Sequence, residues 1–524
     1  MKRKIYFICC IAVLTVTIAS CKKDFLNENL QSTYGPDNTL VDELGFTAGI
    51  AGLQSLVRDQ YAGDQGMIST MHVGTDVARN GILSPAQVPY ENYALMNSQD
   101  VIAQTYWNWA YRVISAANLI IERAADPKAF LSDNARKSFT AEARFFRAFA
   151  YNFISTLFGG VPLVDKPLTA PKTDFTRAKV EDVINFIIDD LKYAADNLPV
   201  VTALKKEGRI NKAAAQQLLA VAYLRANQPA LAEQTLQLII SSGSFSLITS
   251  RYGIKKAQAG DPFADMFIYG NMRRSQGNTE ALWVFEQNYN IPGGFTVGDQ
   301  HRRVWVPFYI NITGMVISDS LGGRGIGRIR PTNWWTYDLY NATDMRNSSY
   351  NIRRKFYYND PASPNYGQQV VVTGADTVFK IYAYTTKWND YNPLEPIGFT
   401  TYKDRIMMRL GETYLLLAEA QFKQGKLLEA ANSINIIRAR ANVAPIPASA
   451  VTMDFILDER ARELIAEELR RLTLVRTGTL IDRVRRYNPF SASVIQDKHA
   501  LLPIPQSEIN LNKDAKLEQN PGYQ

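Results

Sequence analysis

The chain has 524 residues, of which 46% are hydrophobic and 21% charged, and its formal net charge is +8. A chain of this length buries roughly three quarters of the surface that its unfolded form exposes, so core burial alone can hold the fold. Basic residues are scattered and mixed with acidic ones, which predicts a solvated, mildly basic surface and argues against a nucleic-acid partner.

The first residues are typical of a secretion signal. Positive charges at residues 2–4 precede an apolar stretch over residues 5–18, which is shorter than the roughly 20 residues of a membrane span. The stretch ends in small residues followed by Cys21, the bacterial lipobox pattern. We therefore expect a signal peptide at 1–20 and acyl chains such as palmitate on Cys21. The alternative is an uncleaved anchor with an incidental cysteine, which no stop-transfer pattern supports.

Cleavage would also decide the cysteine chemistry. The cysteines are Cys9, Cys10 and Cys21, so two would leave with the signal and the third would carry lipid. The mature chain would then form no internal disulfide, even in an oxidising compartment. Removing three basic residues would lower the net charge from +8 to +5.

Residues from about 40 to 242 show helical periodicity. Phe145, Phe149 and Phe153 recur at i, i+4 and i+8, a stripe that we interpret as a helix core and not as a cofactor site. Glycines at 159–160 and Pro162 would end that helix. Further helices are predicted at about 180–197, 212–227 and 230–241. We expect no cofactor.

From about 243 to 402 the pattern changes to glycine, proline, asparagine and aromatic residues, with brief β-like runs such as residues 370–372. Irregular segments of this length in a globular chain are usually functional. Helices are predicted again at about 406–424, 427–441 and 453–476, within a second helical region at about 403–490. We expect residues 21–524 to form one domain.

An internal repeat links the two helical regions. Ala220, Asn227, Ala232, Leu236 and Ile239 recur, shifted by 198 residues, as Ala418, Gly425, Ala430, Ile434 and Ile437. Small residues at this spacing let two antiparallel helices approach closely, as in tetratricopeptide units. The repeat favours a scaffold of stacked helix pairs over a plain bundle.

Several motifs in a fixed order resemble the SusD/RagB-type outer-membrane nutrient-binding lipoproteins. They are the opening after Cys21 (22–26), Trp107 with Tyr111, Ile114 and Asn118, and the segments 141–148, 158–163, 208–215, 344–346, 387–388, 409–420 and 520–523. No single string is decisive, but their order covers nearly the whole mature chain.

The resemblance implies a mainly α fold. Tetratricopeptide-like helix pairs would form a right-handed scaffold, carrying an irregular ligand-facing half with minor β structure. It also implies a non-catalytic, cell-surface lipoprotein of the outer membrane, which captures oligosaccharides for a SusC-like TonB-dependent transporter. Some relatives of this type handle peptides instead, so a peptide ligand is the alternative within the family. A tetratricopeptide adaptor for other proteins is a third hypothesis.

Enzyme signatures are sparse in the sequence. His72, His301 and His499 lie far apart and show no metal-ligand spacing. The adjacent Glu467 and Glu468 are the obvious carboxylate pair for a surface glycosidase, but neighbours on a helix point in different directions. We expect Glu467 to form a surface ion pair with an arginine one turn on. The glycine-rich run 323–327 leads into an Arg-Ile-Arg-Pro segment and is interpreted as a turn.

Binding chemistry is better supplied, because sugar sites combine aromatic faces with planar polar groups. An early polar-aromatic stretch and the aromatic-rich middle segment offer both kinds of side chain. The candidate ligand-binding residues are Asp76, Arg79, Asn80, Tyr93, Tyr289, Trp305, Tyr309 and Trp334. No calcium-loop motif is present in the sequence, and we predict no metal site.

Overall fold

The computed structural model describes residues 36–289, 291 and 298–523. The predicted signal peptide and Cys21 lie outside the described residues. Within the described part, no helix combines the length and apolar character that a membrane span requires.

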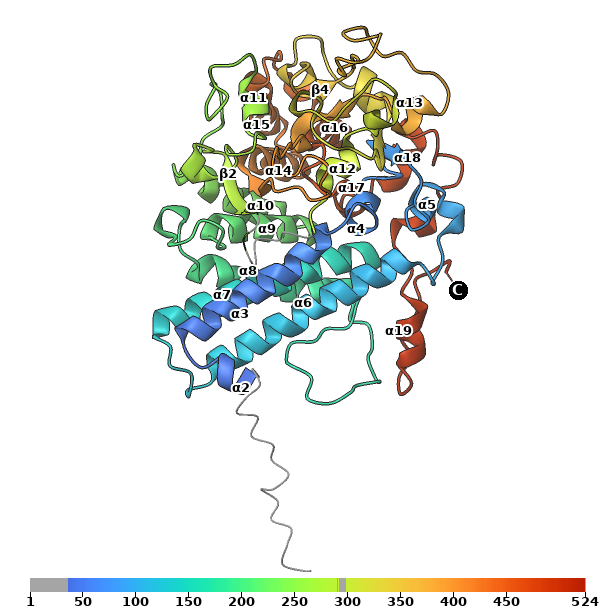
Figure 1. Ribbon diagram of the computed structural model, residues 1–524. Helices are drawn as coiled ribbons and strands as arrows, with labels where there is room; N and C mark the ends of the chain where they lie inside the picture. The colour runs from blue at the N-terminus through green and yellow to red at the C-terminus, as the bar shows by residue number, and fades with distance from the viewer. Residues whose placement is uncertain (1–35, 290, 292–297, 524) are drawn as a thin grey trace, which may run out of the picture.

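Long helices from the first half of the chain form one end of the molecule, the lower end in Figure 1. They are α3 (Glu43–Arg58), α6 (Val101–Ala125), α7 (Asp133–Phe158) and α8 (Val180–Asn197), preceded by the short α2 (Pro36–Thr39). Side chains cap three of them by accepting hydrogen bonds from free backbone N–H groups: Asp42 on α3, Asp100 on α6 and Ser132 on α7. Shorter elements around them are η2 (Asp59–Tyr61), α4 (Met67–Thr70), β1 (Ala78–Asn80), α5 (Val88–Glu91), η3 (Tyr93–Leu95) and η4 (Val201–Ala203).

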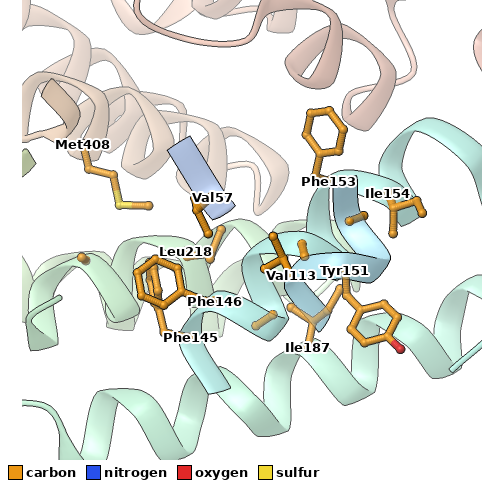
Figure 2. Packing of buried hydrophobic residues seen from close by; sticks show 14 of the residues in the cluster. Val57, Val113, Phe145, Phe146, Tyr151, Phe153, Ile154, Ile187, Leu218 and Met408 are labelled. Atoms are coloured by element: carbon orange, nitrogen blue, oxygen red, sulfur yellow. The ribbon is translucent and has the colours of Figure 1, made fainter. Parts of the chain in front are cut away.

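The phenylalanine stripe on α7 faces the core, as its spacing predicts. Phe145 and Phe153 are buried and Phe149 is partly buried against the same cluster. Figure 2 shows Phe145 and Phe153 among the aliphatic side chains of neighbouring helices. The Trp283 ring meets Phe145 edge-on with centroids 5.4 Å apart, so the strand that carries Trp283 is fastened to this helix.

The internal repeat corresponds to two helix pairs. The first is α9 (Lys212–Arg225) with α10 (Pro229–Ser241), and the second is α14 (Leu410–Lys423) with α15 (Leu427–Arg440). All four repeated alanines are fully buried. Asn227 and Gly425, the turn residues, both have positive φ, 55° and 74°, a conformation that glycine and asparagine tolerate best. Because α10 packs against α14, the two pairs stack directly although a long insert separates them in sequence.

The loop-rich segment between these pairs forms the other end of the molecule (Figure 1). Within it, β2 (Ala281–Phe285) pairs antiparallel with β6 (Arg405–Arg409), and β6 runs directly into α14. Its other elements are α11 (Pro262–Asp265), η5 (Arg274–Gln276), α12 (His301–Trp305), η6 (Tyr309–Asn311), η7 (Asp319–Leu321), β3 (Ile329–Pro331), η8 (Trp334–Asp338), η9 (Met345–Asn347), β4 (Ile352–Arg353), α13 (Asp376–Phe379), β5 (Tyr384–Thr385) and η10 (Thr386–Trp388).

The predicted β run at residues 370–372 is wrong, since it belongs to no strand. The Val370 N–H donates to the Phe356 carbonyl at 2.8 Å, and the Val370 side chain packs in a small core with Val306 and Phe356. The run is apolar because one residue of it is buried, not because it extends a sheet.

The last part of the chain contributes η11 (Ala448–Ala450), α16 (Met453–Leu464), α17 (Arg470–Arg476), α18 (Leu480–Tyr487), η12 (Asp497–Ala500) and α19 (Gln506–Leu511). The single helix predicted at 453–476 is therefore two helices. The break contains Ala466 with a φ of 61°. No glycine or proline marks the break in the sequence.

A network of buried ion pairs joins this part to the rest. Glu463 of α16 contacts Arg346 at 3.0 Å, and also Arg409 and Arg440. Burial alone would raise the pKa of Glu463, but the arginines around it hold that pKa well below its usual range. Arg470 and Arg471 are each 1% exposed, so the predicted solvated surface is wrong for this pair.

Candidate functional site

Strand pairing joins the two segments in which the sequence predicts ligand contacts. β1 and β3 run antiparallel with Arg79 opposite Arg330. Beyond the strands, the Gly81 N–H donates to the Arg328 carbonyl at 2.9 Å and the Ile82 N–H to the Gly327 carbonyl at 2.7 Å. The early and middle segments, distant in sequence, therefore form one continuous surface.

Next to β3, two aromatic rings stack. Trp334 at the start of η8 and Tyr487 at the end of α18 have ring centroids 4.2 Å apart and planes 24° apart. The Arg483 guanidinium lies 5.2 Å from the Trp334 ring and 4.8 Å from the Tyr487 ring. Arg483 is buried and donates to Asp76 at 2.7 Å. A buried ion pair thus supports the stack, and Trp334 and Tyr487 are themselves partly exposed.

The turn that follows α18 brings a third ring to β1. The Arg79 guanidinium lies 3.2 Å from the centre of the Phe490 ring, which is half exposed. The buried Asn488 amide donates to the carbonyls of Thr75 and Ala78, at 2.7 and 3.1 Å, and so fixes the turn against β1. We call Arg79, Arg330, Trp334, Tyr487 and Phe490 the β1–β3 surface.

A second group, which consists of one aromatic ring, three arginines and one aspartate, is connected to the β1–β3 surface. The exposed Phe399 ring lies 4.4 Å from the Arg303 guanidinium and 4.5 Å from that of Arg324. Arg303 and Arg328 share the carboxylate of Asp64, at 3.3 and 3.4 Å. We call these five residues the Phe399 cluster. The Gly327 N–H donates to the Arg303 carbonyl at 3.1 Å, which connects the cluster to the segment that leads into β3.

Of the eight predicted ligand-binding residues, two lie on the β1–β3 surface, one lies elsewhere and five are buried. Arg79 and Trp334 lie on the β1–β3 surface. Tyr289 lies apart from them and meets Tyr402, close in sequence to Phe399, edge-on with centroids 4.7 Å apart. The other five side chains are buried, so none of them presents a face to a ligand in this structure.

Two of the buried residues belong to the charged interior. Asp76 is fully buried and receives hydrogen bonds from Arg470 at 2.6 Å and from Arg483. Burial alone would raise the pKa of Asp76, but the two guanidiniums hold it below its usual value. The Tyr93 hydroxyl donates to the Gly74 carbonyl at 2.8 Å and accepts from Arg471 at 2.9 Å.

The remaining three fasten loops to one another. The Asn80 N–H donates to Glu91 at 2.8 Å. Trp305 is fully buried edge-on against His72, with ring centroids 5.1 Å apart. The Tyr309 hydroxyl donates to the Gly323 carbonyl at 2.7 Å.

Sequence reasoning missed Tyr487, Phe490, Phe399 and Arg330. Tyr487 and Phe490 lie at the end of the second helical region, where no ligand contact is predicted. A usable signal exists there, because Tyr487 and Phe490 flank an Asn-Pro step, a typical turn that would expose aromatic rings.

The carboxylate pair predicted as a glycosidase alternative has a structural role. Glu467 pairs with Lys387 and with Arg409, the latter at 2.6 Å. Glu468 contacts Arg460 at 2.7 Å and Arg470 at 2.9 Å. The predicted surface pair between Glu467 and an arginine one turn on is therefore wrong, since both carboxylates are turned inward and neutralised.

The three histidines are buried as well. Burial lowers the pKa of His72 to about 3 and those of His301 and His499 to about 4, so all three are neutral at pH 7. The residues that the structure describes contain no group of three or more histidine, cysteine or carboxylate side chains placed to hold a metal ion.

Two hollows lie away from these surfaces. A cavity of about 710 Å³ lies between α6, the loop at residues 162–175 and α19. A groove of about 920 Å³ runs along α10, α14 and α15. Neither contains any of the eight predicted residues.

Known proteins similar to this chain share its architecture. A family model described as the SusD family matches residues 279–523, and one described as "Starch-binding associating with outer membrane" matches residues 24–224. SusD-like protein P25 of Formosa agariphila is 24% identical over 534 residues, covering 96% of each chain. A solved laminarin-binding SusD-like protein has a TM-score of 0.70 at 21% identity, covering 91% of this chain and 99% of its own.

Surface glycan-binding protein A from Bacteroides thetaiotaomicron, solved in complex with laminarihexaose, also has a TM-score of 0.70, at 18% identity. That likeness covers 91% of this chain and 99% of the neighbour. The predicted mainly α fold is thereby confirmed.

Proposed function

Because the chain belongs to the SusD/RagB family, we propose that it is a non-catalytic surface lipoprotein that binds oligosaccharide and hands it to an outer-membrane transporter. The observation that carries the proposal is the Trp334–Tyr487 stack beside the arginines of β1 and β3. Aromatic rings take up the apolar face of a sugar, and guanidinium groups bind the polar substituents around it.

Laminarin and laminarihexaose are the ligands named for two structural neighbours. The fold that this chain shares with these neighbours supports a glycan ligand for this chain as well. Binding without cleavage is supported by the position of Glu467 and Glu468, whose carboxylates are held in internal ion pairs. A glycosidase needs two carboxyl groups that flank the scissile bond.

The partner in this proposal is a SusC-like TonB-dependent transporter, and acyl chains on Cys21 would hold the protein beside it at the outer face of the outer membrane. More than one acyl chain is needed for stable anchoring. A family model that covers the first part of the chain is itself described as associating with the outer membrane, which supports this location.

Titration calorimetry against a panel of oligosaccharides and peptides tests the proposal. We expect saturable binding of at least one glycan and no release of reducing ends on prolonged incubation. Trp334→Ala should weaken binding by about tenfold, or about 1.4 kcal/mol, because a stacking face is lost. Phe130→Ala is the matched control, since that ring is 82% exposed and lies at the far end of α6. Binding of peptides alone, or release of reducing ends, would overturn the proposal.

A further inference from the structure

Five arginines belong to the β1–β3 surface and the Phe399 cluster; four of them are partly exposed and Arg328 is buried. The five are Arg79, Arg303, Arg324, Arg328 and Arg330. The carboxylates that contact them within the described part of the chain are Asp64 and Glu91. Other buried arginines either meet several carboxylates, as around Glu463, or bond to carbonyl and hydroxyl oxygens, as Arg471 does. The five arginines of this surface share two carboxylates among the described residues, so the surface carries an excess of positive charge.

Around β1 and β3 the charge is poorly neutralised. Arg330 has no carboxylate within 4.0 Å among the residues described, and its side chain donates to the Asn333 amide oxygen at 3.5 Å. Glu91 lies 3.7 Å from the Arg79 Nε, beyond hydrogen-bond distance, and is occupied by Asn80. The Arg79 Nε is buried without a hydrogen-bond partner. Burial lowers the pKa of Arg79; the nearby Glu91 carboxylate opposes this shift, and the charge of Arg330 adds to it.

The Phe399 cluster has three guanidiniums and one carboxylate. Asp64 contacts Arg303 and Arg328, while Arg324 donates a hydrogen bond to the Ile397 carbonyl. The Arg303 Nε is buried and has no hydrogen-bond partner. Four of the five arginines are partly exposed, so their N–H groups can donate to an anionic ligand group in place of water.

The segment at residues 324–330 joins the two groups. It carries Arg324, Arg328 and Arg330. Its glycines let it pack closely against the backbone of neighbouring loops. A Cβ on Gly325 would meet the Val306 carbonyl oxygen at 2.2 Å, and one on Gly327 would meet that of Phe379 at 2.5 Å. The glycine-rich run therefore serves close packing, which places three arginines along one edge.

We propose, on the premise that this surface binds glycans, that its ligand is an anionic glycan carrying carboxylate or sulfate groups. Guanidinium forks bind such groups bidentately, with a geometry that lysine cannot match. The Trp334–Tyr487 stack takes the sugar ring, and the arginine row takes acidic substituents of successive residues. With a neutral glycan, the five arginines would keep Asp64 and Glu91 as their carboxylate partners among the described residues, and the positive charge would stay in excess.

The test compares ligands that differ only in charge. Calorimetry is run with an oligogalacturonate and its carboxyl-reduced form, with a sulfated galactan oligosaccharide and its desulfated form, and with laminarihexaose. We expect each charged form to bind at least tenfold more tightly than its neutral counterpart, with affinity falling as salt rises. The better of the two charged ligands identifies the acid group.

Single arginine variants test whether this surface causes the preference for charged glycans. Arg330→Gln and Arg324→Gln should each weaken binding of the charged form severalfold more than binding of its neutral counterpart. Arg112→Gln is the matched control, because the Arg112 side chain on α6 is 62% exposed. Equal affinity for charged and neutral forms would overturn this inference and leave glycan binding standing. Binding of no glycan, or only of an acidic peptide, would overturn both.

Discussion

Asp76 connects the ion-pair interior to the β1–β3 surface. Its carboxylate holds Arg470 and Arg483, and Arg483 lies beside the Trp334–Tyr487 stack. Although the sequence suggests a ligand contact for Asp76, the side chain is fully buried. Its role is to position the residues that the ligand would meet.

Replacing the Asp76 carboxylate should lower the free energy of unfolding. Asp76→Asn keeps the shape but leaves two buried guanidiniums without their shared anion, and breaking a buried pair costs about 3 kcal/mol or more. Urea unfolding would measure the loss. Asp482→Asn is the control, because Asp482 pairs with Arg486 on the surface with 66% of its side chain exposed, and such pairs contribute less than about 1 kcal/mol. Equal effects of the two changes would contradict this role.

The Asp76 carboxylate should also make the stability of the folded protein fall at low pH. Burial alone would raise the pKa of Asp76, but the two guanidiniums hold the pKa of the folded form below its usual value. In the unfolded chain the pKa of an aspartate is about 3.9. Its contribution is therefore complete above about pH 4 and is lost as the pH falls through the folded pKa. Thermal unfolding from pH 7 to pH 2 should show a fall that is shallower in Asp76→Asn. Identical profiles would show that Asp76 is not involved.

Residue chemistry alone predicted ligand contacts for Arg79 and Trp334, which lie on the candidate surface. It could not show that Trp305 and Tyr309, predicted on the same grounds, are buried. All four lie in polar, aromatic-rich segments, and burial depends on contacts made by distant parts of the chain. Trp305 is covered by His72, whereas Trp334 meets Tyr487 and is partly exposed. A single sequence does not encode which ring a distant turn will cover.

At the scale of elements, the stacked helix pairs carry the surface. Glu233 on α10 accepts hydrogen bonds from Gln421 of α14 at 3.3 Å and from the adjacent Gln424 at 2.8 Å. These contacts fix α10 against α14, and β6 leads directly into α14. The position of the loop-rich half therefore depends on how closely the helices approach.

Enlarging a buried repeat alanine should disturb that approach. Ala430→Leu on α15 inserts three carbons into a fully buried position and should destabilise the protein by about 1–3 kcal/mol. Ala439→Leu on the same helix is the matched control, because Ala439 is exposed. Denaturant unfolding measures both. A stable Ala430→Leu protein would show that the pair is loosely packed.

Helices with a clear apolar period could be predicted from the sequence, and α7 and the two repeat pairs lie close to their expected positions. The break between α16 and α17 could not, because Ala466 adopts positive φ without a glycine or proline to signal it. The pairing of β1 with β3 was also invisible, since each strand has three residues, too few to show an alternating pattern.

At the scale of the whole molecule, the two ends differ. In Figure 1 the first described helix, α2, lies at the helical end, and α18 with the β1–β3 surface lies toward the loop-rich end. A tether that leads into α2 would leave the candidate surface pointing away from the attachment point. This arrangement suits a protein that captures a ligand beside a transporter.

The tether itself can be tested in cells. Cys21→Ser should abolish incorporation of labelled palmitate and shift the protein from the membrane fraction to the soluble one. Glycan affinity of the purified variant should not change, because the β1–β3 surface does not include the N-terminal segment. Continued membrane fractionation and labelling of Cys21→Ser would contradict the predicted lipid anchor.

A crystal structure of the protein with its tightest-binding oligosaccharide tests the central claim most directly. We predict sugar density against the exposed parts of Trp334 and Tyr487, with ligand oxygens within hydrogen-bond distance of Arg79 or Arg330. An intact glycosidic chain should be visible. Density located instead in the cavity beside α6 or in the groove along α10 and α14 would contradict this account of where the glycan binds.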